Sequence, residues 1–129
     1  MKGLIIGEPW IGLILQGNKT WEMRTGTWKH RGVIGLIRKK SGLVVGVAEL
    51  VDNRLPLTNL GAYAEAENFH RIPPEQQAAA FAGGWTTPWV LRNAQPLRRP
   101  VPYTHPSGAV KSVNLSEEVA AQVQRQLAA

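Results

Sequence analysis

Apolar residues along the chain occur in short runs that are typical of β-strands. Residues 3–6 and 33–37 are continuous apolar runs, which favour strands buried on both faces. Residues 43–51 form a third, β-rich run, and the polar segment 39–42 joins it to the second, so we expect a β-hairpin here. Gly46 lies inside the third run, where glycine marks a bend or a close backbone approach.

Residues 19–24 alternate apolar and polar side chains, which is the period of a half-buried strand. Alternation puts Trp21 and Met23 on one face of this strand and Glu22 and Arg24 on the other. We therefore expect Trp21 and Met23 to face apolar surroundings, and the two charged residues to face a polar site.

Three more strands are predicted in the second half of the chain, at residues 85–92, 96–103 and 110–115. The first two of these stretches contain four prolines. Proline has no amide hydrogen to donate, so we expect these two strands to lie at a sheet edge or to pair irregularly.

The same pattern predicts four helices. The first opens at Pro9 and ends at Gly17, since proline suits the first helical position and glycine a left-handed end. Two short helices follow, near residues 60–67 and 73–81. Ser116 caps the last helix, in which apolar side chains recur every four residues and face the core.

Taken together, these elements predict an α+β fold. We expect a small mixed or antiparallel β-barrel with peripheral α-helices, formed by residues 1–129 as a single domain, because 129 residues is the size of one domain.

Charge indicates the kind of partner. The chain carries 15 Lys and Arg against nine Asp and Glu, for a formal net charge of +6, and most of the excess lies within residues 1–64. A positive field concentrated on one half of the protein favours a polyanion such as nucleic acid.

Other classes are disfavoured by what the sequence does not contain. There is no cysteine, which excludes disulfides and thiolate metal sites and fits a reducing compartment. No apolar run approaches a membrane span, and the N-terminal run is too short for a signal peptide, so we expect a cytoplasmic protein with no membrane partner. The three histidines lack metal-ligand spacing and no phosphate-binding loop is present, so we expect no metal and no cofactor.

One group of charged residues stands out: Lys19, Glu22 and Arg24, placed directly after the predicted first helix. A turn at Gly17 would let the lysine side chain curl over the face that carries the other two charges. Lysine and arginine would then donate to a phosphate or a base edge, and the carboxylate would orient one of them. Strict alternation would instead put Lys19 opposite Glu22, and a surface ion pair would then be the simpler interpretation.

The spacing Gly17-x-Lys19-x-x-Glu22-x-Arg24, preceded by Pro9-Trp10 and a short apolar helix, resembles the signature of the ASCH (activating signal cointegrator homology) domain family of the PUA-like superfamily. The resemblance is closest over residues 3–52. It implies a PUA-like β-barrel with a cleft between the barrel and the first helix that binds RNA or single-stranded nucleic acid.

The resemblance leaves open whether the chain is an enzyme. Some members of the family resemble ribonucleases, and Lys19, Glu22 and Arg24 would then supply the cation, base and phosphate clamp of catalysis. A small subgroup removes acyl groups from modified cytidine, but it uses a threonine nucleophile where this chain has Glu22, so this amidohydrolase alternative is less favoured. An adaptor that grips an acidic protein tail is a third alternative.

Further binding residues are expected around the same cleft. Trp10 and Trp28 are the tryptophans expected near it, whereas Trp21 and Trp89 are expected inside the protein. The full set of predicted nucleic-acid-binding residues is Trp10, Lys19, Arg24, Trp28, Lys29, Arg31, Arg38, Lys39, Ser107 and Lys111. The oligomeric state is not indicated by any pattern in the sequence.

Overall fold

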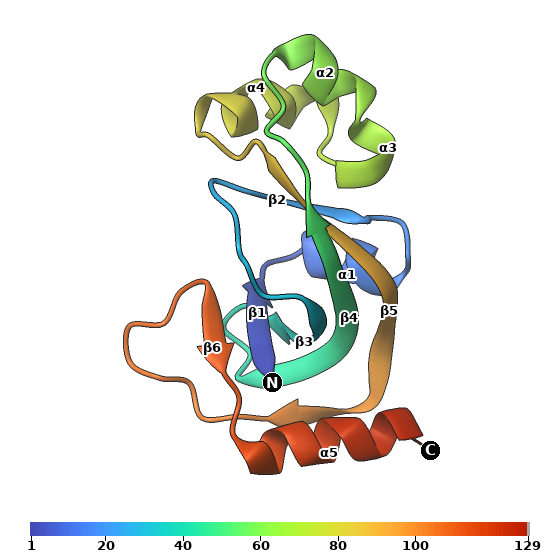
Figure 1. Ribbon diagram of the computed structural model, residues 1–129, viewed down its shortest axis with the longest axis vertical. Coiled ribbons are helices and arrows are strands. Elements are labelled where there is room, and N and C mark those ends of the chain that lie inside the picture. The colour runs from blue at the N-terminus through green and yellow to red at the C-terminus, as the bar shows by residue number, and fades with distance from the viewer. Residues whose placement is uncertain (129) are drawn as a thin grey trace.

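The computed structural model describes residues 1–128 and consists of one curled six-stranded sheet with five helices around it (Figure 1). The strands are β1 (Lys2–Ile6), β2 (Trp21–Arg24), β3 (Gly32–Arg38), β4 (Leu43–Asn53), β5 (Thr87–Pro102) and β6 (Ser112–Asn114). The helices are α1 (Trp10–Leu15), α2 (Leu60–Glu65), α3 (Glu67–His70), α4 (Pro74–Ala82) and α5 (Glu117–Ala128).

The strand order across the sheet is β2-β5-β4-β3-β1-β6. Only β1 and β3 are paired in parallel; every other neighbouring pair is antiparallel, including the hairpin of β3 and β4. The sheet is therefore mixed and curls into a half-barrel, which confirms the predicted α+β class. In Figure 1, α2, α3 and α4 gather at one end of the sheet and α5 packs at the other.

The pairing of β4 with β5 is irregular. Their register shifts at three places, including between Val44 and Gly46. A Cβ on Gly46 would lie 2.3 Å from the Leu15 side chain and 2.8 Å from the Gln95 carbonyl oxygen. The prediction of a close backbone approach at Gly46 is confirmed, because only a hydrogen fits between α1 and β5 at this point.

The second half of the sheet differs from the sequence-based prediction. The two strands predicted at residues 85–92 and 96–103 are one strand, β5, which bends instead of breaking, with Asn93 at a φ of 53°. The strand β2 pairs only with the first four residues of β5. The later prolines of β5 therefore lie where β4 is the only neighbouring strand. The expectation of an edge position holds for these later prolines.

Two apolar clusters make up most of the core. One lies between the sheet and α1 and includes Ile11, Ile14 and Trp89; the other lies under α5 and includes Val119 and Val123. The Ser116 hydroxyl accepts a hydrogen bond from the Val119 amide at 3.2 Å, as predicted for the cap of α5.

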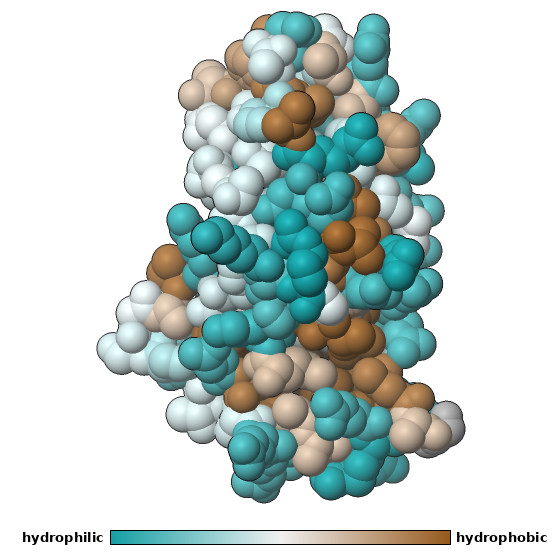
Figure 2. Space-filling model, in the orientation of Figure 1, coloured by the Kyte–Doolittle hydropathy of each residue, from teal (hydrophilic) through white to brown (hydrophobic). Residues whose placement is uncertain are grey.

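The segment from α2 to α4, which we call the helical group, has a third, smaller cluster that joins its Tyr63 and Ile72 to Met23 of β2. This cluster anchors α2–α4 to the end of the sheet. Figure 2 shows hydrophilic residues gathered over the middle of one face, where β2 passes β4 and β5. Within residues 1–128, no helix is long and apolar enough to cross a membrane.

Candidate functional site

A cleft of about 1090 Å³ lies between the helical group and the end of the sheet formed by β1 and β3. Its most deeply buried polar residues are Lys19, Glu22 and Arg24, which are 2%, 7% and 9% exposed. We call these three residues the floor of the cleft. Trp10 of α1 also lines it.

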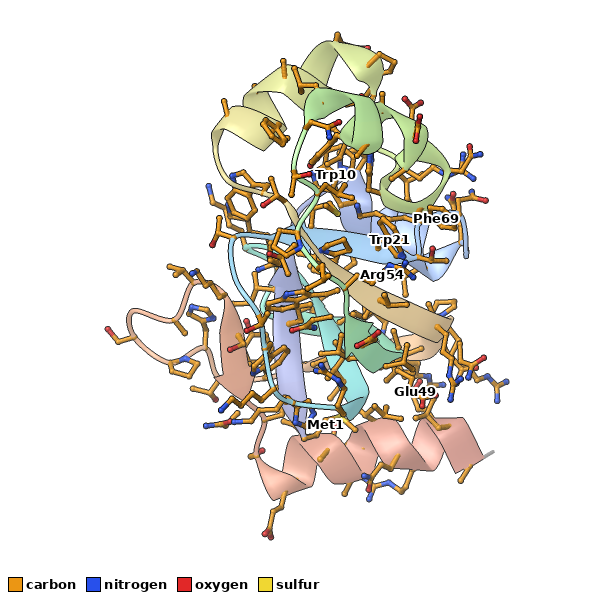
Figure 3. All side chains as sticks on the ribbon, turned by 45° about the horizontal axis from the view of Figure 1, so that its top comes forward. Met1, Trp10, Trp21, Glu49, Arg54 and Phe69 are labelled. Carbon is orange, nitrogen blue, oxygen red and sulfur yellow. The ribbon has the colours of Figure 1, made fainter. Side chains whose placement is uncertain are left out.

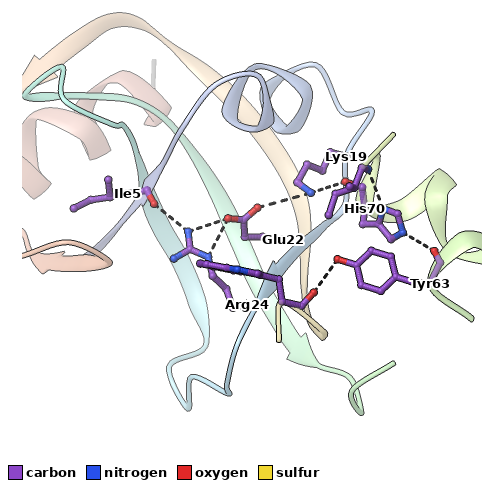
Figure 4. Close-up of polar contacts among 8 residues, drawn as sticks. Ile5, Lys19, Glu22, Arg24, Tyr63 and His70 are labelled. Carbon is purple, nitrogen blue, oxygen red and sulfur yellow. Dashed lines mark hydrogen bonds and ion pairs between the residues drawn. The ribbon is translucent and has the colours of Figure 1, made fainter. Parts of the chain in front are cut away.

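The three floor residues are within contact of one another (Figure 4). Arg24 donates from Nε to Glu22 Oε2 at 3.0 Å, and its Nη2 lies 2.8 Å from the same oxygen. Lys19 Nζ lies 3.8 Å from Glu22 Oε1, which is an ion pair but too long for a direct hydrogen bond. The carboxylate therefore stands between two cations.

Lys19 reaches this position because it precedes β2 and does not follow its alternation. Gly17, at a φ of 81°, turns the chain after α1, and the amides of Asn18 and Lys19 both donate to the Leu13 carbonyl. The lysine stem then extends over the face of β2 that carries Glu22. The predicted convergence of the three charges is present, and the simple alternation that opposed it does not apply.

Burial changes the acid–base behaviour of Lys19. The pKa of its ammonium is lowered to about 8, mainly because burial disfavours the charged form, with Arg24 adding repulsion and Glu22 opposing the shift. At neutral pH, a minority of the protein molecules therefore carry a neutral Lys19 amine. Such a group can donate a proton or accept one near physiological pH.

The floor is tied to both halves of the fold. Arg24 Nη2 donates to the Ile5 carbonyl at 3.0 Å, and its guanidinium lies 5.5 Å from the ring centroid of Trp89. Lys19 Nζ donates to the His70 carbonyl at 2.5 Å and lies 5.2 Å from the ring centroid of Trp10. The floor is thus held by β1 on one side and the helical group on the other.

His70 itself is fully buried and acts as a structural link. Its Nδ1 accepts from the Ile72 amide at 2.9 Å, so its Nε2 donates to the Tyr63 carbonyl at 2.7 Å. Burial lowers the pKa of the imidazole, and the charge of Lys19 lowers it further. No sequence pattern links His70 to the floor, because the contact with Lys19 is made by a backbone atom.

The two sides of the cleft have different chemistry. The basic wall comes from the β3–β4 turn and the loop before β6, and consists of Arg38, Lys39, Lys40 and Lys111. The helical wall consists of Ile72, Glu75, Gln76, Ala79, Ala80 and Trp85. Arg38 forms an ion pair with Glu8 at the edge of the cleft, and the other cations of the basic wall are exposed.

Of the predicted binding residues, the cleft brings together Trp10, Lys19, Arg24, Arg38, Lys39 and Lys111. The structure places four others away from the cleft lining: Trp28, Lys29, Arg31 and Ser107. The Trp28 ring packs 5.5 Å from that of Trp89, on the core side of its loop. Arg31 donates to the carbonyls of Trp28 and His30 and so braces the same loop.

Trp21 also differs from the expectation that it lies inside. It is only partly buried, stacks on Phe69 with ring centroids 4.7 Å apart, and has the Arg54 guanidinium 5.3 Å from its ring centroid (Figure 3). Trp89 is buried, as expected.

Sequence reasoning missed the helical wall. Glu75, Gln76 and Trp85 lie far from the floor along the chain, and only the fold brings them to it. Trp85 could be recognised as one of five tryptophans, but nothing in the sequence separates it from those that enter the core. Among residues 1–128, no cluster of three or more histidine or acidic side chains is arranged to hold a metal ion.

Comparisons with known proteins place the fold. The family model of the ASCH domain matches residues 4–101. The crystal structure of ASCH from Zymomonas mobilis is similar, with a TM-score of 0.74 and 17% sequence identity, covering 96% of this chain and 93% of that chain. A variant of the same Zymomonas protein matches with a TM-score of 0.73, 17% identity, and coverage of 96% and 94%. No curated protein sequence matches the chain.

Proposed function

The chain belongs to the ASCH domain family, and we propose that it binds RNA or another single strand of nucleic acid in the cleft above Lys19, Glu22 and Arg24. The family is generally linked to RNA binding. The observation that carries the proposal is that the basic wall and the buried floor line one continuous cleft.

The basic wall supplies what a phosphate backbone requires. Lys39, Lys40 and Lys111 are exposed and belong to two neighbouring connections, so several phosphates of one strand can be contacted in succession. Such contacts attract a polyanion without selecting its sequence.

The burial of the floor favours an unpaired strand over a duplex. The floor residues are at most 9% exposed, so only a slim group such as a single base or phosphate can reach them. A duplex presents phosphates but keeps its bases stacked and paired, so it cannot bring a base to the floor as an unpaired strand can.

Binding is tested by fluorescence anisotropy with labelled single-stranded RNA and DNA oligonucleotides between about 50 and 200 mM salt. We expect affinity to fall steeply with salt, and the Lys39→Gln/Lys40→Gln variant to reduce the slope of log K against log salt by about 1.4. The matched control is Arg98→Gln/Arg99→Gln, which removes the same charge from exposed positions outside the cleft lining. Equal losses in both variants, or binding that ignores salt, would contradict the proposal.

Hydrolysis of the bound RNA is the catalytic extension of this proposal. In this role Lys19, whose pKa is about 8, supplies the cation and can exchange a proton with the substrate near neutral pH. Glu22 supplies the base and Arg24 neutralises a phosphate. The test is cleavage of end-labelled RNA by the wild type and by Glu22→Gln. Equal cleavage by both proteins would remove the catalytic role.

The lowered pKa of Lys19 also favours a second candidate, an amidohydrolase acting on an acylated cytidine nucleoside, because such chemistry uses a lysine near its neutral form. The carboxylate of Glu22 occupies the position where that activity has a threonine, which speaks against it. Turnover of acylated cytidine, with Lys19→Ala as the control, is the direct assay. Absence of turnover by the wild type removes this candidate.

A further inference from the structure

We propose that Trp85 is the base-stacking residue of the cleft, so that the strand lies with its phosphates along the basic wall and a base against the helical wall. This inference rests on the proposed function and adds the orientation of the bound strand. Trp85 was not among the residues that the sequence marked for binding.

Exposure singles out Trp85. Six large apolar side chains are exposed within residues 1–128, and of these only Trp85 and Val110 line the cleft. Trp85 is 43% exposed, although it is an aromatic side chain that normally gains from burial. An exposed indole inside a cleft provides a flat apolar surface for a ligand.

The indole is held in place by its surroundings. The Trp85 amide donates to the Ala80 carbonyl at 3.1 Å, and the Trp85 carbonyl accepts from the Tyr63 hydroxyl at 2.8 Å. The ring lies against Gly83, where a Cβ would be 3.0 Å from the indole Cδ1. Because the backbone is hydrogen-bonded and the ring already lies against Gly83 before binding, less conformational entropy is lost when a base stacks on the exposed part.

A chain of hydrogen bonds also connects Trp85 to the floor, and Figure 4 shows the part of it that runs from Tyr63 through His70 to Lys19. The Tyr63 hydroxyl binds the Trp85 carbonyl, the Tyr63 carbonyl binds the His70 imidazole, and the His70 carbonyl accepts from Lys19. Wall and floor are therefore positioned as one unit, and a nucleotide can contact both without moving the helices.

The identity of the occupant follows from the contrast between the two walls. The basic wall requires a polyanion, while the opposite wall offers an indole with the small side chains of Ala79 and Ala80 beside it. A nucleic acid strand combines repeated phosphates with flat bases, and any base can stack on tryptophan. An acidic peptide or a polyphosphate satisfies only the basic wall.

The experiment compares an intact single-stranded oligonucleotide with an abasic one of equal length and charge. We expect the wild type to bind the intact strand about five to 150 times more tightly. Trp85→Ala should bind both strands with the weak affinity of the abasic one, and Trp85→Phe should recover part of the preference. Phe69→Ala is the matched control, because Phe69 is 47% exposed but does not line the cleft.

Each outcome decides between the two proposals. If Trp85→Ala keeps the full preference for the intact strand, the stacking role is wrong while nucleic-acid binding stands. If the wild type binds the abasic strand as tightly as the intact strand, no base is stacked and the inference fails without any variant. If it binds an acidic peptide as tightly as the intact strand, the occupant assigned to the cleft is wrong. If the wild type binds no strand, the proposed function itself fails.

Circular dichroism and thermal unfolding establish that Trp85→Ala is folded. Should that variant not fold, Trp85→Phe and the comparison of strands on the wild type still decide the question.

Discussion

The ammonium of Lys19 lies 2.5 Å from the backbone carbonyl oxygen of His70, although the two residues are 51 positions apart in the chain. This contact joins the turn after α1 to the end of α3, and it satisfies a buried carbonyl with a buried cation. The position of the floor lysine therefore depends on the docking of the helical group against the sheet.

Burial of Lys19 predicts a specific dependence of stability on pH. Its pKa is 10.5 when exposed and about 8 when folded, so the unfolded chain holds the proton more tightly. The contribution of Lys19 to the free energy of unfolding is therefore lowest below pH 8, rises between pH 8 and 10.5, and is then constant. This gain amounts to about 3 kcal/mol.

The measurement is urea unfolding from neutral pH to above pH 10.5, for the wild type and for Lys19→Met. The difference between the two proteins should change by the stated amount across this range, because all other titrating groups are shared. Curves that run parallel would show that Lys19 is not desolvated in the folded protein.

Burial of His70 predicts a second dependence of stability on pH, in the acidic range. Its pKa is lowered from 6.5 on folding, so stability is complete above pH 6.5 and is lost as the pH falls from there toward the lowered value. Protonation of Nδ1 also removes the acceptor of the Ile72 amide. The NMR titration of the His70 ring should therefore have its midpoint below 6.5, the ordinary pKa of histidine. A midpoint at or above 6.5 would contradict the buried, neutral imidazole.

Substitution of Gly46 and of Gly26 by alanine compares a tightly packed glycine of the sheet with one that has open space around it. We expect Gly46→Ala to destabilise the protein by about 3 kcal/mol or more, since its Cβ would overlap Leu15 and the Gln95 carbonyl. Gly26 has no atom within 4 Å of an added Cβ and no positive φ, so Gly26→Ala should leave stability nearly unchanged or slightly higher. Equal midpoints of thermal unfolding for both variants would show that the close approach at Gly46 is not required.

Two arginine–carboxylate pairs with similar geometry should differ in their effect. Arg24→Ala leaves the Glu22 carboxylate buried with Lys19, at 3.8 Å, as its one remaining cation, and we expect a loss of about 3–5 kcal/mol in the free energy of unfolding. Arg92 binds Glu49 through two hydrogen bonds of 3.0 Å but is exposed, so Arg92→Ala should change stability very little. Chemical denaturation of both variants gives the comparison, and a larger effect at Arg92 would reverse the ranking.

The local part of the candidate site could be predicted from the sequence because its residues are close together along the chain. Lys19, Glu22 and Arg24 lie within one turn and one strand, and the direction of those elements is set by Gly17 and by alternation. Arg38 ends β3 and Lys39 opens the turn to β4, a hairpin that the sequence predicts, and the pairing of β1 with β3 brings this turn to the cleft.

The rest of the site depends on contacts between distant segments. Trp85 lines the same cleft as the floor only because the segment α2–α4 folds back to the end of the sheet. Trp28 packs against the core because its loop passes Trp89. The hydrophobic pattern of the sequence does not distinguish these two tryptophans, because both occupy similar loop positions. The merging of two predicted strands into β5 has the same origin, since pairing with β4 holds together a stretch that its prolines would otherwise interrupt.

The segment that supplies the helical wall leaves and rejoins the sheet at neighbouring points. Asn53 at the end of β4 pairs with Trp89 of β5, and the Arg54 amide donates to the Pro88 carbonyl at 2.9 Å. Residues 55–86 thus form an excursion between two strands that are already hydrogen-bonded at its base. Insertions, deletions or exchange of this segment during evolution can alter which ligands a cleft of this kind accepts while the pairing of the strands beneath it persists.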